Sequence, residues 1–227
     1  HSAARAKPAT ITTENKINPS DDGLTRVWDF PVRAFHWLLT LSITGSWITA
    51  EAGFEWTELH ILLGYFTLSL ILFRIIWGFL GTRHARFSQF IQPPTAFAKS
   101  LRHLFSRAPS KEAGHTAAGG WSILIMLALV TIQAGSGLFV SDDIFWMGPY
   151  NSTVSAEIAG KLAYVHHTNF ILLQIIIALH ICAIAWYKWG KKTDLVRPMF
   201  TGNKLIANRQ AGIKDSRIRV ALWVMLA

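Results

Sequence analysis

Four histidines lie at matching depths within the apolar segments of this chain. His166 and His180 are 14 residues apart in one such segment, so an α-helix would place them within about 40° of one face and about 21 Å apart along its axis. His36 lies near the start of an earlier apolar segment, and His60 lies at the start of the next one. We expect His36 to face His180 at one level and His60 to face His166 at the other. Each pair then spans two helices, as ligation of one haem iron by two imidazoles requires.

Two b haems, each held by one pair, are the chemistry that this spacing favours. One zinc ion bound by all four histidines is excluded, because zinc ligands converge at about 2 Å whereas the two layers are about 20 Å apart. A haem-free, proton-coupled transporter is an alternative, because ionisable groups inside a membrane are usually functional. The apolar segments hold no matching Asp or Glu to pass protons on. Ordinary buried histidines are the remaining alternative.

Neighbouring residues are candidates for supporting roles. His167 points about 140° away from His180 on a helix, so His166 is the expected ligand, and His167 is expected at a haem propionate, at an outer partner or at the membrane interface. Arg74 lies inside the second apolar segment, where it either snorkels to the surface or pairs with a propionate of the inner haem. Arg33 is a second candidate neighbour of a propionate, as is Lys188. Gly64, one turn after His60, allows either the approach of a flat macrocycle or close helix packing, as do Gly135 and Gly137.

The elements that must position these residues are transmembrane helices. Hydrophobic residues make up 51% of the 227 residues and charged residues only 15%, a balance typical of a bilayer protein. Four stretches approach or exceed the roughly 20 apolar residues that a helix needs to cross the hydrocarbon core: about 34–51, 58–80, 121–140 and 163–189. We expect an all-α integral membrane protein, a four-helix transmembrane bundle with up-down topology.

The charges give an independent prediction of topology. All Lys and Arg residues except Lys161 fall in the terminal segments, at the inner end of a span or in the link between the second and third spans, whereas the other two links are acidic. Because Lys and Arg collect on the cytoplasmic side, both termini are expected in the cytoplasm, and the protein is expected in the bacterial inner membrane as a multi-pass protein in contact with lipid. Topology also accounts for the net charge of +9, and we expect no nucleic-acid partner. The single cysteine, Cys182, excludes a Cys-x-x-Cys-His attachment of c-type haem.

Three regions are expected along the chain. Residues 1–25 form a polar cytoplasmic tail, residues 26–205 form the di-haem transmembrane domain, and residues 206–227 are basic and then apolar. The last apolar run is expected as a truncated fifth helix or as an interfacial one. In the long basic link, residues 95–105 are expected to form a surface helix ended by Pro109. His84, His103 and His115 lie in this link and are expected at the interface, with His84 or His103 as candidate hydrogen-bond donors to a quinone.

Several motifs together resemble the bacterial di-haem cytochrome b family, which includes membrane subunits of nickel-iron hydrogenases, gamma subunits of formate dehydrogenases and the cytochrome b-561 type. The resemblance covers about residues 26–205. The motifs are VWDFPVRAFHW around His36, ELH at His60, FRIIWGFLGTRHARFSQF, AGHTAAGGW, SDDI, VHH followed by LH, and LVRPMFTGNK.

This resemblance implies two b haems held by histidines of the first, second and fourth helices. It makes His36 and His180 the inner ligands and His60 and His166 the outer ligands, in agreement with the spacing. It also implies electron transfer between the quinone pool and a periplasmic partner, either a c-type cytochrome or an iron-sulfur subunit of hydrogenase type. A stand-alone quinone-linked oxidoreductase, such as a superoxide-quinone type, is the alternative. The outer link with Asp142, Asp143, Phe145 and Trp146 either docks the partner or forms an interfacial belt.

Overall fold

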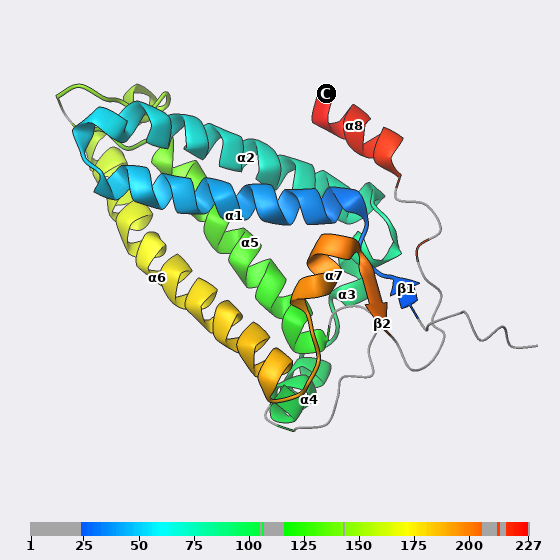
Figure 1. Cartoon of the computed structure of the whole chain (residues 1–227). Coiled ribbons are helices and arrows are strands. Elements are labelled where there is room, and N and C mark those ends of the chain that lie inside the picture. Colours follow the sequence, from blue (N-terminus) through cyan, green and yellow to red (C-terminus); the bar gives the residue numbers. More distant parts are fainter. Residues whose placement is uncertain are drawn as a thin grey trace, which may run out of the picture.

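The computed structural model describes residues 24–104, 106, 116–142, 144–205, 213 and 217–226. Four long helices dominate this part of the chain (Figure 1). They are α1 (Phe30–Glu51), α2 (Thr57–Leu80), α5 (Ala117–Gly137) and α6 (Ala156–Trp189). The shortest has 21 residues, which at about 1.5 Å per residue matches the roughly 30 Å of a hydrocarbon core.

Three of these helices are long and apolar enough to cross a membrane by length and composition: residues 54–80, 117–137 and 156–189. The prediction of an all-α membrane protein is therefore confirmed. α1 has the length of a span, but it carries more polar residues, among them Arg33, His36, Ser42, Thr49 and Glu51. Hydropathy alone does not assign α1 to the bilayer.

The first two long helices form an antiparallel hairpin. The link between them is tight, with Gly53 at a positive φ of 101° followed by the short helix η1 (Phe54–Trp56). Inside the hairpin, the Ser42 hydroxyl lies 2.7 Å from the Thr67 hydroxyl and donates to the main-chain oxygen of Leu63 at 3.0 Å. Small hydroxyl side chains allow close helix contact in a membrane and satisfy each other there.

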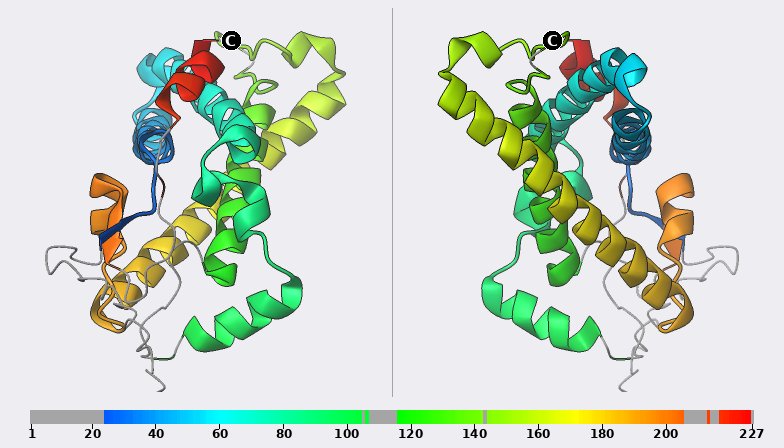
Figure 2. Two further views of the ribbon diagram at one scale, coloured as in Figure 1. Left: turned by 90° about the vertical axis from the view of Figure 1, so that its right-hand side faces the viewer. Right: turned by 90° about the vertical axis from the view of Figure 1, so that its left-hand side faces the viewer.

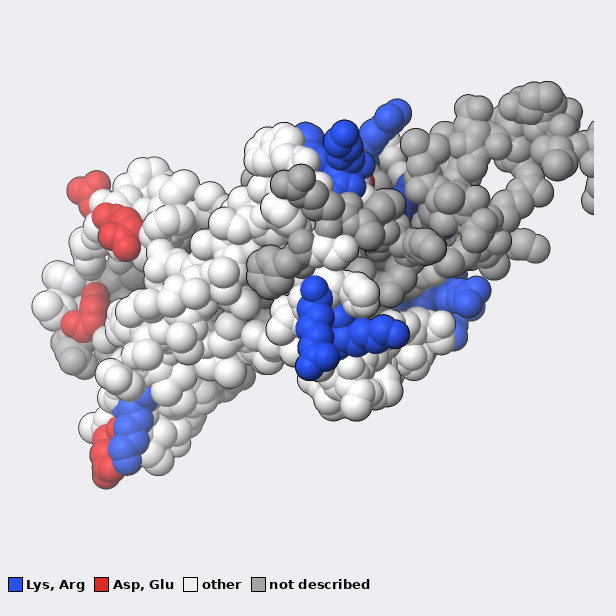
Figure 3. All heavy atoms as spheres, turned by 90° about the horizontal axis from the view of Figure 1, so that it is seen from below, with Lys and Arg blue, Asp and Glu red and all other residues white. Residues whose placement is uncertain are grey.

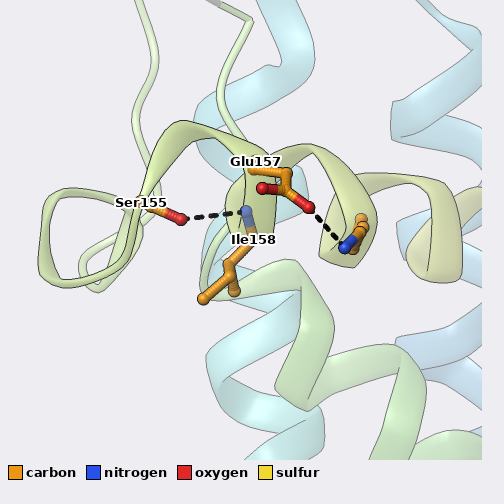
Figure 4. A network of polar contacts seen from close by, with 4 residues as sticks. Ser155, Glu157 and Ile158 are labelled. Atoms are coloured by element: carbon orange, nitrogen blue, oxygen red, sulfur yellow. Dashed lines mark hydrogen bonds and ion pairs between the residues drawn. The ribbon is translucent and has the colours of Figure 1, made fainter.

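α5 and α6 form the second hairpin. The two hairpins meet through a buried apolar cluster of Ile71, Val130 and Leu173, contributed by α2, α5 and α6. α6 runs obliquely to the first hairpin, and its C-terminal end lies apart from the start of α1 (Figures 1 and 2). At its other end, α6 begins at Ala156 after the N-cap Ser155, whose hydroxyl accepts from the main-chain N–H of Ile158. Glu157 in the first turn forms an ion pair with Lys161 in the next turn at 2.6 Å (Figure 4).

Charges separate to the two ends of the bundle. The acidic side chains of the two short links gather at one end, where Lys161 is paired with Glu157, and the Lys and Arg side chains gather at the other (Figure 3). We call the acidic end the outer end and the basic end the inner end. This separation places the four long helices between two surfaces of opposite charge, as the sequence predicts.

A buried carboxylate joins three segments at the inner end. Asp29, only 1% exposed, is the N-cap of α1 and accepts from the main-chain N–H of Val32 at 2.7 Å. Its second oxygen accepts from the indole N–H of Trp77 at 3.2 Å and from the hydroxyl of Thr82 at 2.5 Å. Asp followed by Phe-Pro is a helix-start signal, and it explains why α1 begins at Phe30 rather than near residue 34.

The first and last segments of the membrane domain in sequence are also joined to each other. Strand β1 (Leu24–Arg26) pairs antiparallel with β2 (Asn203–Leu205), next to the short helix α7 (Val196–Thr201). Gly202 has a φ of 84°, and a Cβ there would lie 2.8 Å from the main-chain oxygen of Trp28, so this turn requires glycine. The sequence gives no expectation of this pairing, and β1 straddles the expected end of the polar tail at residue 25.

Short helices complete the inner end: η2 (Arg83–Ala85), α3 (Phe87–Phe90), α4 (Pro94–Leu104) and α8 (Ile218–Leu226). α4 matches the expected surface helix over residues 95–105, whereas Pro109 lies outside the described residues. The last carbonyls of α4 are capped from α6, because Trp186 donates to Leu104 at 2.8 Å. The apolar run near residue 220 is helix α8, which has nine residues and buries Ala221 in the cluster that contains Trp77.

Candidate functional site

His60 is fixed by the neighbouring helix of its own hairpin. It is the fourth residue of α2, and its Nδ1 lies 2.8 Å from the main-chain oxygen of Ser46 on α1. A carbonyl oxygen only accepts, so Nδ1 must carry the proton and donate. The other ring nitrogen, Nε2, is then the one with a free lone pair, which is the form of histidine that ligates a metal.

His166 on α6 shows the same arrangement with α5. Its Nδ1 lies 2.9 Å from the main-chain oxygen of Gln133 and 3.4 Å from the hydroxyl of Ser136. Its Nε2 lies 3.2 Å from the side-chain nitrogen of Gln133, which donates because Nδ1 already holds the ring proton. A Cβ at Gly137 would lie 3.0 Å from the His166 ring, so this glycine gives the imidazole its room.

The rings of His60 and His166 face each other across the two hairpins. Their centroids are 6.3 Å apart and their planes differ by 81°. Two imidazoles on opposite sides of one metal, each about 2 Å from it, have centroids roughly 6 Å apart, so this spacing fits one iron between them. An iron there would replace the Gln133 amide as the partner of the Nε2 lone pair. The centroid spacing and the carbonyl partners of the two Nδ1 atoms are thus compatible with ligation of one iron by both imidazoles.

The inner pair is less organised by protein contacts. Among the described residues, no ring contact links His36 to His180, and the His36 ring packs edge-on against Trp37 with centroids 5.0 Å apart. The Nδ1 atom of His36 is buried and has no hydrogen-bond partner among the described residues. A buried nitrogen of this kind is costly unless a further group satisfies it.

Glycines near the outer pair leave space for a ligand. A Cβ added at Gly64 or at Gly135 would meet nothing within 4 Å, so neither glycine serves close helix packing. A hollow of about 720 Å³ opens between α1 and α6, lined by Trp47, Ile48, Glu51, Ala52 and Gln174. None of the four histidines lines this hollow. The open space at Gly64 and Gly135 is compatible with the approach of a planar macrocycle.

The two candidate arginines lie at the inner end with different contacts. The guanidinium of Arg33 donates to the main-chain oxygen of Phe200 and has a buried Nε atom without a partner among the described residues. Arg74, 4% exposed, donates to the main-chain oxygen of Ala85 at 3.2 Å and lies 5.0 Å from the ring of Phe87. Ala85 in turn donates its main-chain N–H to the main-chain oxygen of Thr82 at 3.0 Å, and the Thr82 hydroxyl binds Asp29. Arg74 is therefore linked to the Asp29 cluster through Ala85 and Thr82, whereas Arg33 contacts α7.

The remaining histidines are not brought into either pair. His167 is exposed, with its ring centroid 5.8 Å from that of His166. His84 lies against Trp28, and burial, followed by the charge of Arg83, lowers its pKa. His103 is exposed, and His115 lies outside the described residues.

Polar residues inside the spans support the site and were not singled out from the sequence. Asn169, one turn after His166 on α6, is 5% exposed. Its side-chain N–H₂ donates to the main-chain oxygen of Leu129 at 2.9 Å and to the side-chain oxygen of Gln133 at 2.8 Å. Gln133 and Asn169 are rare polar residues in otherwise apolar windows. This isolated polarity is the feature of the sequence that could have indicated their role.

Helices of membrane-spanning length with histidines that meet across them, as His60 and His166 do, are typical of multi-pass membrane proteins that bind haem and transfer electrons. The model of one family, prokaryotic cytochrome b561, matches residues 27–202, and the chain belongs to this family, whose members bind b-type haem. The chain is also similar to a probable Ni/Fe-hydrogenase B-type cytochrome subunit of Rhizobium leguminosarum bv. viciae. The two are 21% identical over an alignment of 217 residues, and the match covers 81% of this chain and 90% of the relative. No solved structure matches the chain.

Proposed function

We propose that the protein carries electrons across the membrane through two bis-histidine b haems. His60 and His166 hold the outer haem, and His36 and His180 hold the inner one. The observation that carries this proposal is the shared geometry of His60 and His166: each Nδ1 donates to a main-chain carbonyl, and the ring centroids are 6.3 Å apart. A bound haem with two histidine ligands supplies one-electron chemistry and leaves no open coordination position.

The chain's own residues orient the ligands and balance charge. The carbonyls of Ser46 and Gln133 fix the tautomer of the outer ligands and make them more basic. At the inner level, Arg33 is the proposed neighbour of a haem propionate because its buried Nε atom has no hydrogen-bond partner among the described residues. Arg74 acts at the same level by stabilising the Asp29 cluster that holds the start of α1 in place. Lys188, in the last turn of α6, is a second cationic neighbour.

The proposed topology places all four long helices across the bacterial inner membrane as an up-down bundle. α1 is included because its hydroxyl side chains are satisfied within the hairpin and because it supplies His36. The acidic outer end and the basic inner end support cytoplasmic termini. Residues 26–205 then form the di-haem domain, preceded by a cytoplasmic tail and followed by a basic segment that ends in α8.

We further propose that the haems connect the quinone pool to a periplasmic subunit of hydrogenase type. The hydrogenase cytochrome subunit from Rhizobium supports this assignment. The outer end offers a surface for such a subunit, because the loop after α5 exposes the large apolar side chains Ile144, Phe145 and Met147 among acidic residues. A partner surface with an apolar centre and a basic rim would be complementary to it.

The test is a haem count on single-histidine variants. The purified protein should give two b haems per chain by pyridine haemochrome assay, and His60→Ala and His180→Ala should each give about one. His167→Ala is the matched control, because this exposed neighbour of His166 should keep both haems. Two haems in both test variants, or loss of a haem in His167→Ala alone, would refute the ligand assignment.

A further inference from the structure

Asn169 and Gln133 form a polar bridge between α6 and α5 next to His166. Asn169 uses one side-chain nitrogen to reach two oxygens that lie one turn apart on α5: the main-chain oxygen of Leu129 and the side-chain oxygen of Gln133. Those residues occupy the same stripe of α5 because they are four positions apart. Asn169 therefore fixes α5 against α6 both along the axis and in rotation.

This bridge lies directly beside the acceptor of the ligand. Gln133, whose side chain Asn169 holds, is also the residue whose main-chain oxygen accepts from Nδ1 of His166 at 2.9 Å. A shift of α5 along α6 would lengthen or misalign that hydrogen bond, which weakens steeply with angle. Asn169 is the closest polar residue to His166 on the same stripe of α6, three positions further along.

We propose that Asn169 is a positioning residue for the outer haem, and that it tunes the reduction potential of that haem through Gln133. The inference rests on the proposed role of His166 as an outer ligand. A strong hydrogen bond from Nδ1 makes the imidazole more basic and favours ferric over ferrous iron. Weakening this bond therefore makes the outer haem easier to reduce.

The contacts predict an order of effects. Asn169→Leu removes both bonds to α5. Gln133→Leu removes the side-chain acceptor and the amide that contacts Nε2 of His166, but it leaves the bond from Asn169 to Leu129 and the main-chain oxygen of residue 133. In the holoprotein, where iron would take the place of that amide, Asn169→Leu should have the larger effect, and the double variant should match Asn169→Leu because the two share a contact. Gln174→Leu is the matched control: Gln174 is another amide of α6, but it lines the hollow beside α1.

The experiment is a spectroelectrochemical titration of the purified holoprotein, with electron paramagnetic resonance of the ferric haems. Asn169→Leu should raise the ratio of reduced to oxidised outer haem about tenfold at a fixed ambient potential, a shift of about 59 mV for one electron. The g values of that haem should shift, while those of the inner haem stay constant. Loss of the outer haem alone from Asn169→Leu would also support the proposal, since it reports an unseated ligand.

His180→Ala separates the inference from the proposed function. In this background only the outer haem should remain, so its potential is read without overlap. If His180→Ala or His60→Ala fails to remove one haem, the ligand assignment fails. If both behave as expected but Asn169→Leu leaves the potential and g values as in Gln174→Leu, the positioning role alone is refuted. Loss of both haems from Asn169→Leu would assign Asn169 to general stability and would also overturn the proposal.

Discussion

Replacing Asp29 by Ala should destabilise the protein more than replacing any exposed carboxylate. The Asp29 side chain is almost fully buried and accepts three hydrogen bonds. Loss of the bond to Val32 removes the N-cap of α1, worth about 1 kcal/mol. The indole N–H of Trp77 and the hydroxyl of Thr82 then lose a buried acceptor, at about 1–3 kcal/mol each. The expected loss of unfolding free energy is about 3–7 kcal/mol.

The charge of Asp29 adds to this effect. Arg74 is buried and is joined to the same cluster through Ala85, so Asp29→Ala removes an anion from the surroundings of a buried cation. Asp29→Asn keeps the shape of the side chain and one acceptor. The amide nitrogen would face the donor groups of Trp77 and Thr82, so Asp29→Asn should fall between the wild type and Asp29→Ala.

The assay is thermal unfolding in detergent, followed by tryptophan fluorescence and by the haem absorbance. The midpoint of Asp29→Ala should fall on the order of 10 °C for a chain of this length. Asp194→Ala is the matched control, since the exposed Asp194 accepts from the main-chain N–H groups of Val196 and Arg197 at 2.8 and 3.1 Å. This control should cost about 1 kcal/mol or less. Equal losses in the two variants would refute the role of the buried cluster.

Further predictions concern two glycines and the outer loop. Gly78→Ala should cost about 1–3 kcal/mol because its Cβ would overlap the ring of Phe87. Gly64→Ala, whose Cβ would meet nothing within 4 Å, should lower the haem content but leave the unfolding midpoint of the haem-free protein unchanged. Thermal unfolding and a haemochrome assay check both. The main-chain N–H groups of Trp146, Ile144 and Phe145 lower the pKa of Asp142. The hydrogen bonds that order this loop should therefore be fully formed above the ordinary Asp pKa of about 3.9. They should be lost as the pH falls through the lowered pKa of Asp142. Fluorescence of Trp146 in a variant lacking the other tryptophans should follow that loss, and Asp142→Ala should show the low-pH signal at neutral pH.

The long helices could be predicted from the sequence because their length and composition follow from the bilayer itself. The first and last residues of these helices could not be predicted as closely. α6 begins at Ala156 rather than near residue 163, because the capping hydroxyl of Ser155 and the pair of Glu157 and Lys161 extend the helix beyond the apolar window. α5 ends at Gly137 rather than at residue 140. These signals are local, but hydropathy does not register them.

The supporting residues of the candidate site could not be predicted, because they depend on how two helices are aligned. The four histidines follow from residue type and spacing. Gln133 and Asn169 become partners only once α5 and α6 have a fixed register, and they are 36 positions apart. The pairing of β1 with β2 likewise joins segments nearly the whole domain apart. A pattern read along the chain contains no information on such registers.

The contacts around α7 have a consequence for the order in which the protein is assembled during synthesis. α1 is made first, yet it is the long helix that length and composition alone do not assign to the bilayer. Its first turns are held by residues made much later: Trp37 stacks on Phe200 with centroids 4.5 Å apart and donates to the main-chain oxygen of Met199 at 3.2 Å. α1 can therefore reach its final position only after the ribosome has passed residue 200. The same holds for His36, one residue before Trp37. The inner haem site would then be completed after translation of the whole membrane domain, later than the outer one.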